Sequence, residues 1–205
     1  MLSTPSKPVM GFSLIELMIT IALIAILLML AIPAFGKWSA DAHVRAAAES
    51  LVNAIRLTQS TGVARGRTSM FALATDTPPV VTSTPVASSP NWFAELNPLG
   101  GSDETRAKLG LILKSTEGTQ HGVTIAGPAL TCFSATGRQA TLLAAATSVS
   151  AACTAPTDDV ASPTIYTVSR TGATRSFKVL VYLGGRVRLC DAAKTLSSTN
   201  PDGCP

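Results

Sequence analysis

The N-terminal part of the chain contains the feature that most constrains the fold, a long apolar run with one carboxylate at its start. The 20 residues from Leu17 to Gly36 have no ionisable side chain. As a helix they extend about 30 Å, the thickness of a bilayer's hydrocarbon core. Glu16 immediately precedes them, and a carboxylate in apolar surroundings is disfavoured unless a positive group pairs with it. The run therefore predicts a helix able to span a membrane, with a partner required for Glu16.

A secretory signal peptide is the competing interpretation, because a short segment with Lys7 precedes the run. The run is long for such a signal, and no A-x-A cleavage site follows it. Residues 31–35 instead lead directly into an amphipathic helix. A plain membrane anchor would leave Gly11, Phe12 and Glu16 unexplained.

The segment "GFSLIEL", Gly11 to Leu17, with its short leader and the apolar run with Pro33, resembles the class III signal of type IV pilins and pseudopilins. The resemblance implies that a prepilin peptidase removes residues 1–11 by cutting after Gly11. It also implies that the new N-terminus, Phe12, is methylated, and that residues 12–36 form a transmembrane and filament-core helix.

The same resemblance supplies a role for Glu16 in assembly. In a filament, its carboxylate would pair with the amino group of a neighbour's Phe12, and the apolar setting would strengthen that pairing. The implied location is the inner membrane, with a single span and a periplasmic domain, before incorporation into a pilus or pseudopilus. The implied partners are other minor and major pilins, the prepilin peptidase, the inner membrane and the pilus assembly platform.

The residues after Gly36 predict an amphipathic half of the same helix, residues 37–64. Apolar positions recur at steps of 4, 3, 4 and 3, and glycines near residue 62 predict its end. These positions are Val44, Ala48, Leu51, Ile55 and Thr58. Residues 65–205 then suffice for one globular domain.

A charged fraction of 14% and aromatics at 5% suit a β-rich extracytoplasmic domain. Strand-like segments are expected at 68–74, 109–113, 123–126, 130–135, 165–169 and 176–183. Residues 75–90, with four prolines, and residues 139–163 are expected to be loops. The long helix and these segments predict an α+β fold, and the resemblance to pilins implies the type IV pilin fold, with its helix packed on an antiparallel β-rich domain.

Two further segments indicate which family of pilin-like proteins the chain resembles. "LVNAIRLTQSTGVARGR", which keeps part of an RxxAxxRG-like signature, and "GRVRLC" are similar to the GspH/FimT family of minor pilins and pseudopilins. This similarity implies a FimT/FimU-type minor pilin in the priming or tip complex of a type IV pilus. The alternative is a GspH-like minor pseudopilin of a type II secretion system.

The four cysteines all follow the apolar run. In an oxidising periplasm, an even count suggests two disulfides, and three pairings are possible. Proximity favours Cys190–Cys204 and Cys132–Cys153. A zinc site is the alternative, but there is no C-x-x-C and the chain has only two histidines. No metal and no cofactor are expected.

No enzyme motif is present. His43 and His121 are 78 positions apart and neither lies in a nucleophile motif. The acidic pairs Asp103-Glu104 and Asp158-Asp159 fall in loop-like segments, where solvated charges are expected. A membrane-anchored periplasmic enzyme therefore has no support, and no catalytic residue is predicted.

The segment Gly185-Arg186-Val187-Arg188 stands out in the basic C-terminal part of the chain. From residue 161 onward there are six basic and two acidic residues. On a strand, Arg186 and Arg188 would share one side, with Val187 facing the core. Resemblance to FimT-type minor pilins implies that Gly185, Arg186 and Arg188 bind the phosphates of double-stranded DNA in natural transformation. The alternative is two solvated arginines beside a glycine turn, bridged to Asp191.

Overall fold

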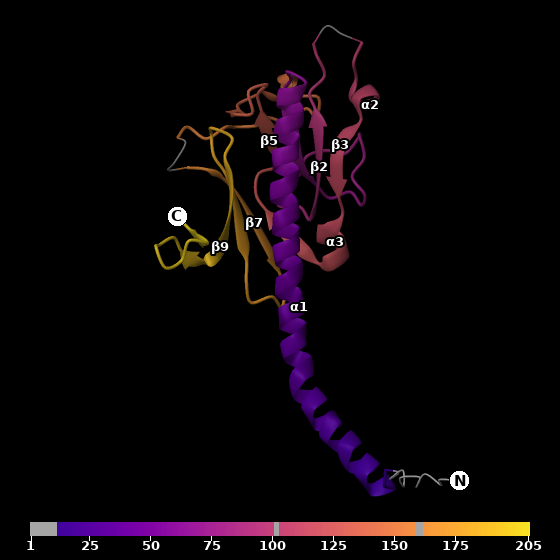
Figure 1. The fold of residues 1–205 in the computed structure, drawn as a ribbon. Coiled ribbons are helices and arrows are strands. Elements are labelled where there is room, and N and C mark those ends of the chain that lie inside the picture. Colours follow the sequence, from indigo (N-terminus) through magenta and orange to yellow (C-terminus); the bar gives the residue numbers. More distant parts are fainter. Residues whose placement is uncertain (1–11, 101–102, 159–161) are drawn as a thin grey trace, which may run out of the picture.

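The computed structural model describes residues 12–100, 103–158 and 162–205. One long helix, α1 (Leu14–Ala64), leads into a β-rich domain of two sheets. The helix lies along one side of this domain, and its first half projects beyond it (Figure 1). The predicted α+β architecture, with the second half of the helix packed on antiparallel sheets, is confirmed. Over the parts of the chain that the structure describes, no helix combines the length and mean hydropathy needed to cross a membrane.

The ends of α1 follow local chemistry. At the start, Ser13 is the N-cap and its Oγ accepts the Ile15 N–H at 3.3 Å. At the other end, Gly66 adopts a φ of +61° just beyond the cap. The helix ends at Ala64, the bound predicted for its amphipathic half, and so runs past Gly62, one of the glycines expected to end it. A Cβ at Gly62 would lie 2.6 Å from Ser69 Oγ, so this glycine permits close packing rather than stopping the helix.

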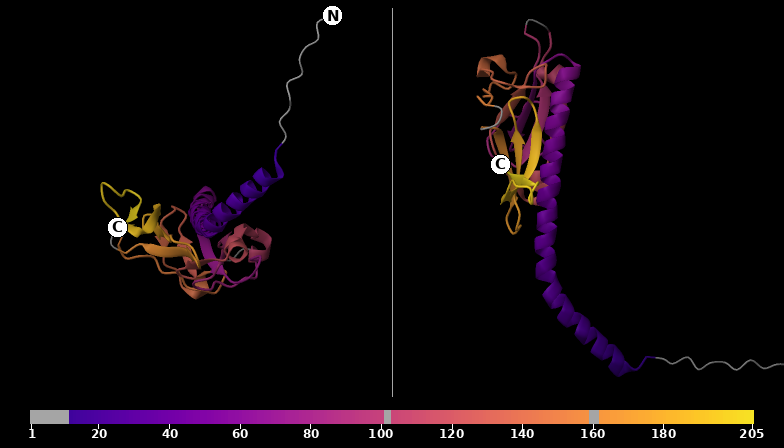
Figure 2. Two further views of the ribbon diagram at one scale, coloured as in Figure 1. Left: turned by 90° about the horizontal axis from the view of Figure 1, so that it is seen from below. Right: turned by 60° about the vertical axis from the view of Figure 1, so that its left-hand side comes forward.

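The docked half of α1 buries the predicted stripe. All five positions of that stripe have no exposed surface: Val44, Ala48, Leu51, Ile55 and Thr58. The polar member, Thr58, satisfies its hydroxyl by donating to the Ala54 carbonyl oxygen at 2.7 Å. This face packs on both sheets, whose strands stand together on one side of the helix (Figure 2).

Within the described residues, sheet A has the strand order β3-β2-β1-β5-β6 and sheet B the order β10-β9-β8-β7-β4. The strands of sheet A are β1 (Ser69–Ala74), β2 (Asn91–Leu96), β3 (Leu111–Ser115), β5 (Leu130–Phe133) and β6 (Gln139–Ala140). Those of sheet B are β4 (Val123–Ala126), β7 (Thr164–Arg170), β8 (Phe177–Val181), β9 (Val187–Thr195) and β10 (Gly203–Cys204). Pairing is antiparallel except between β9 and β10.

Three short helical segments complete the part of the fold that the structure describes: α2 (Arg106–Leu109), α3 (Glu117–His121) and a 3-10 turn (Ala144–Ala146). Residues 75–90 contain no helix or strand, as predicted from their prolines. Each predicted strand segment contains a strand, but the one expected at 109–113 begins only at Leu111. Gly110, with a φ of +68°, first ends α2. The expected loop at 139–163 contains β6 and the 3-10 turn.

The apolar residues form three clusters. The main core lies between α1 and the inner faces of both sheets. A second cluster covers the outer face of sheet A and includes Cys132 and Cys153. A third covers the outer face of sheet B, with Tyr182, Cys190 and Cys204. Each pair of cysteines therefore lies on the outside of one sheet.

Candidate functional site

The first candidate site is the segment that projects beyond the domain, residues 12–38, which comprises the first half of α1 and the two residues before it. Its exposed large apolar side chains range from 53% exposure at Leu28 to 84% at Phe12. A helix that is apolar on all sides is stable only when other apolar groups cover it. This segment therefore exposes a large apolar surface.

Glu16 lies in the first turn of α1, at an exposed position. Its carboxylate has no hydrogen bond or ion pair among the described residues, although the helix N-terminus favours a negative charge there. Gly11 and the rest of the predicted leader, residues 1–11, lie outside the described residues. Cleavage, Phe12 methylation and Glu16 pairing remain predictions.

A second feature, which the sequence does not predict, attaches the domain to the helix at the point where the helix begins to project. The Asp41 carboxylate accepts the backbone N–H groups of Thr174 at 2.7 Å and Arg175 at 3.0 Å, and the Thr174 hydroxyl at 2.5 Å. The hydroxyl bond is the main reason that the pKa of Asp41 is held below its ordinary value. No local pattern in the sequence predicts this contact, because Asp41 is 133 residues from Thr174 and 134 from Arg175.

The predicted DNA-binding segment begins in a tight turn after β8. The Gly185 N–H donates to the Tyr182 carbonyl oxygen at 2.9 Å. Gly185 has a φ of +91°, and a Cβ there would lie 2.2 Å from the Gly137 carbonyl oxygen. The position requires glycine on both counts. Gln59 of α1 fastens the turn by donating to the Gly185 carbonyl oxygen at 2.7 Å.

The two arginines of this segment have different surroundings. Val187 between them is buried, as predicted. Arg186 is exposed, and its guanidinium lies 4.1 Å from the centre of the Tyr182 ring. Arg188 is half-buried and donates to the carbonyl oxygens of Pro201 at 3.0 Å and Gly203 at 3.1 Å. Only Arg186 therefore presents its charge outward.

The bridge from an arginine to Asp191, the alternative considered above, is wrong for Arg188. Asp191 is buried, and its Oδ1 accepts the Ala193 N–H at 3.0 Å instead. Arg188 thus holds the C-terminal loop to β9. The same loop has an ion pair between Lys194 and Asp202 at 2.6 Å, which lowers the pKa of Asp202.

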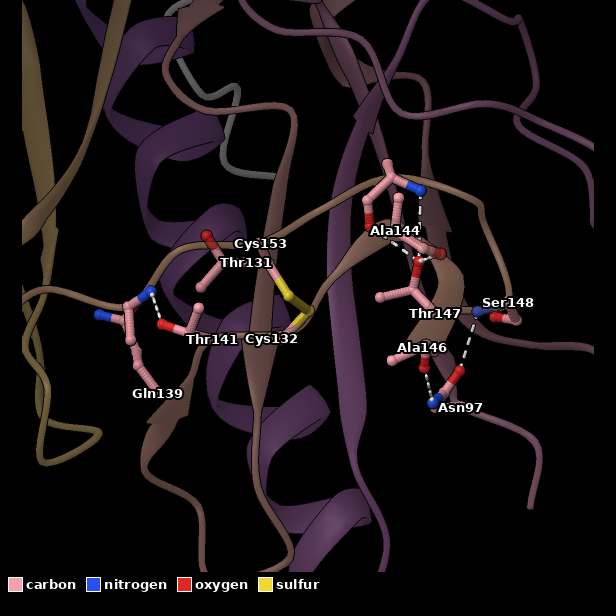
Figure 3. Close-up of a disulfide and its surroundings, with 12 residues drawn as sticks. Asn97, Thr131, Cys132, Gln139, Thr141, Ala144, Ala146, Thr147, Ser148 and Cys153 are labelled. Carbon is pink, nitrogen blue, oxygen red and sulfur yellow. Dashed lines mark hydrogen bonds between the residues drawn. A yellow bond between two sulfur atoms is a disulfide. The ribbon is translucent and has the colours of Figure 1, made fainter. Parts of the chain in front are cut away.

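Both predicted disulfides are present. Cys190–Cys204, with Cα atoms 5.1 Å apart, joins β9 to β10 and closes the C-terminal loop. Cys132–Cys153, with Cα atoms 5.9 Å apart, ties the loop after β6 to β5. Figure 3 shows this second disulfide beside Thr141, with Asn97 bonded to Ala146 and Ser148 farther along the same loop. The pairing leaves no free cysteine among the described residues to bind a metal.

A buried ion pair, which the sequence also does not predict, lies on the outer face of sheet A. Glu95 is 1% exposed, and Arg106 Nε donates to its two carboxylate oxygens at 3.1 and 3.0 Å. Ser148 donates to Glu95 Oε1 at 2.7 Å. Arg106 also donates to the Ser83 carbonyl oxygen at 3.2 Å. The pair thus joins α2, β2 and both long loops.

The two histidines, distant in sequence, meet in space. The rings of His43 on α1 and His121 on α3 stack with centres 4.4 Å apart and planes 17° apart. Within the described ranges, no three or more His, Cys, Asp or Glu residues are grouped as a metal site would require. Of the loop acids noted above, Glu104 pairs with Arg67 at 2.6 Å, which lowers the pKa of Glu104.

Comparison with known proteins gives a structural likeness but no sequence match. No family model matches the chain, and no curated protein matches its sequence. Among solved structures, the chain is similar to the type IV minor pilin FimU of Pseudomonas aeruginosa, with 14% identity and a TM-score of 0.44. The similarity covers 73% of this chain and 94% of that one.

Proposed function

We propose that this chain is a minor pilin that acts in the priming or tip complex of a type IV pilus. The proposal rests on the projecting half of α1, whose large apolar side chains are exposed. Glu16 is the one ionisable residue between Phe12 and Lys37. Neighbouring helices of the same kind can cover such a segment completely. The docked half then holds the β-rich domain on the outside of the filament.

In this proposal, residues 12–36 lie in the inner membrane before assembly. Cleavage after Gly11 creates a positive amino group at Phe12, four residues before Glu16. In the filament, that amino group on one subunit pairs with the Glu16 carboxylate of the next. Because both charges leave water together, the pairing favours one register between helices.

The experiment compares Glu16→Ala with the matched control Glu49→Ala in a strain producing the pilus. Glu49 is an exposed acid on the docked half of the same helix, paired only with Arg45 at 2.9 Å. Mass spectrometry should find methylated Phe12 as the first residue in both variants. Sheared filaments should contain the Glu49 variant at wild-type levels and much less of the Glu16 variant. Equal recovery, or an intact Met1, would contradict the proposal.

The alternative function is that of a minor pseudopilin in type II secretion, which would use the same helix. A deletion strain distinguishes the two. Loss of twitching with normal protein secretion supports the pilus, and the reverse supports the secretion system.

A second candidate function, DNA binding, is favoured by Arg186. Its exposed guanidinium lies over Tyr182, an arrangement that leaves N–H donors available to a phosphate. Such contacts would bind duplex DNA weakly and without base preference. A DNA-uptake assay on the deletion strain, complemented with wild type or Arg186→Gln, tests this role.

A further inference from the structure

We propose that the outward edge of β3 is a docking site for an extended, acidic segment of a partner protein, which would add to sheet A as a further strand. This inference goes beyond the pilin role and does not depend on it. It rests on the position of β3, on the grooves beside it and on the charge around them.

β3 is the outermost strand of sheet A. It pairs with β2 on one side, and no described strand pairs with its other side. Figure 1 shows β3 at the flank of the domain, with α2 and α3 near its two ends. The opposite edge of the sheet is different, because β6 has two residues and its Gln139 N–H donates to the carbonyl oxygen of Leu183, in the turn after β8, at 2.9 Å. An outer strand presents backbone donors and acceptors that a partner strand can use.

Grooves lie on both faces of β3. On the outer face, a groove of about 490 Å³ is formed by Val80 and Val81 with residues 111–114. On the α1 face, a groove of about 470 Å³ lies between the helix and the side chains of Trp92 and Leu113. Successive side chains of an added strand point to opposite faces of the sheet. One groove would therefore accept alternate side chains, and the other the side chains between them.

Apolar side chains line most of both grooves; the charged residue of the outer groove is Lys114, and that of the groove beside α1 is Glu49. Val80 and Leu57 are each 46% exposed at the rims. Lys114 is exposed, and its ammonium has no hydrogen bond or ion pair with the residues that the structure describes. Glu49, the acid beside the α1 groove, already pairs with Arg45. A segment with alternating apolar residues and a carboxylate facing Lys114 fits this surface.

A bulge limits the length of the contact. The register between β2 and β3 shifts so that Ala94 faces Leu113 and Glu95 faces Leu111. Ile112 is left without a partner on β2, which bends the strand. Regular pairing is thus short, and recognition depends on side chains in the grooves as well as on the backbone.

The test uses the full chain in detergent micelles and a capped peptide, Thr-Val-Asp-Val-Thr-Val-Thr, as the probe. We expect the peptide to slow amide hydrogen exchange at residues 111–115 and to leave sheet B unchanged. A peptide with proline in place of two valines should have no effect, because proline lacks the donor. Unchanged exchange at β3, or equal protection of sheet B, would overturn the proposal.

Charge reversal provides the matched control. Lys114→Glu should weaken binding of the acidic peptide about threefold, as expected for an exposed ion pair. A peptide with lysine in place of aspartate should bind the Lys114→Glu variant with the affinity that wild type has for the aspartate peptide. Lys37→Glu, an exposed lysine on the projecting helix, should bind as wild type. Equal effects of the two variants would show that Lys114 is not at the site.

Discussion

The Asp41 carboxylate on α1 accepts the backbone N–H of Thr174, 133 residues later in the chain, at 2.7 Å. Thr174 lies in the turn between β7 and β8, so the bond fastens sheet B to the helix where the docked half begins. Trp38, one turn earlier, is already 67% exposed. Among the described residues, Asp41 is therefore the last polar attachment of the domain before the helix projects.

This attachment should depend on pH. The Thr174 hydroxyl bond, together with the backbone N–H bonds, lowers the folded-state pKa of Asp41. Its contribution to stability is complete above the unfolded-state pKa of about 3.9 and is lost as pH falls through the lower, folded-state pKa. Thermal unfolding between pH 7 and 2 should therefore show a shallower acid limb for Asp41→Asn than for wild type. Asp76→Asn, an exposed control, should follow wild type, and parallel curves for all three proteins would contradict this role.

Breaking the buried ion pair should destabilise the domain strongly. Glu95→Gln leaves the Arg106 guanidinium, 18% exposed, without its carboxylate. Loss of one partner of a buried pair costs about 3–5 kcal/mol. Urea unfolding of Glu95→Gln should show a loss of this size. The double variant Glu95→Leu with Arg106→Met should lose less, because no buried charge remains, and a double variant as unstable as the single one would contradict the argument.

Much of the fold could be predicted from sequence because its signals are local. The helix face at Val44 to Thr58 follows from spacing alone, and both disulfides follow from proximity. β2 was missed because it has no alternating pattern and contains Glu95, a charge that suggests exposure. Its neutralisation by Arg106, 11 residues later, depends on tertiary structure.

The candidate site was predictable only in part, for the same reason. The roles proposed for Phe12 and Glu16 rest on a contiguous motif and remain predictions. The different surroundings of Arg186 and Arg188 do not, because they depend on where Pro201 and Gly203 place their carbonyl groups. The Asp41 attachment and the stacked histidines likewise join segments that no local pattern relates.

Removing the C-terminal disulfide should release the loop that Arg188 holds. Cys190 and Cys204 are 14 positions apart, and a loop of this size contributes about 3 kcal/mol through the unfolded state. Replacing both by serine should lower the free energy of unfolding by this amount and open residues 196–202 to proteases. Replacing Cys132 and Cys153 should give a similar loss but leave the terminal loop protected. Proteolysis at the same rate in both variants would contradict the assignment.

Substitutions of Arg186 and Arg188 should have different effects, one on DNA binding and the other on the stability of the fold. Arg186→Gln removes an exposed charge, so duplex DNA should bind more weakly while the thermal midpoint stays nearly unchanged. The log-log salt dependence of its affinity should flatten by about 0.9 for one lost phosphate contact. Arg186→Lys should keep part of the affinity because it retains the charge but not the paired donors.

Arg188→Gln should show the opposite pattern. It removes the donor to two loop carbonyl oxygens, so the free energy of unfolding should fall by about 1–3 kcal/mol. Because this guanidinium is turned to the loop, the salt slope of DNA binding should stay within error of wild type. Filter binding at several salt concentrations, with urea unfolding of the same proteins, measures both quantities. If Arg188→Gln flattens the slope as much as Arg186→Gln does, both arginines contact phosphate, and the division of roles derived from their surroundings is wrong.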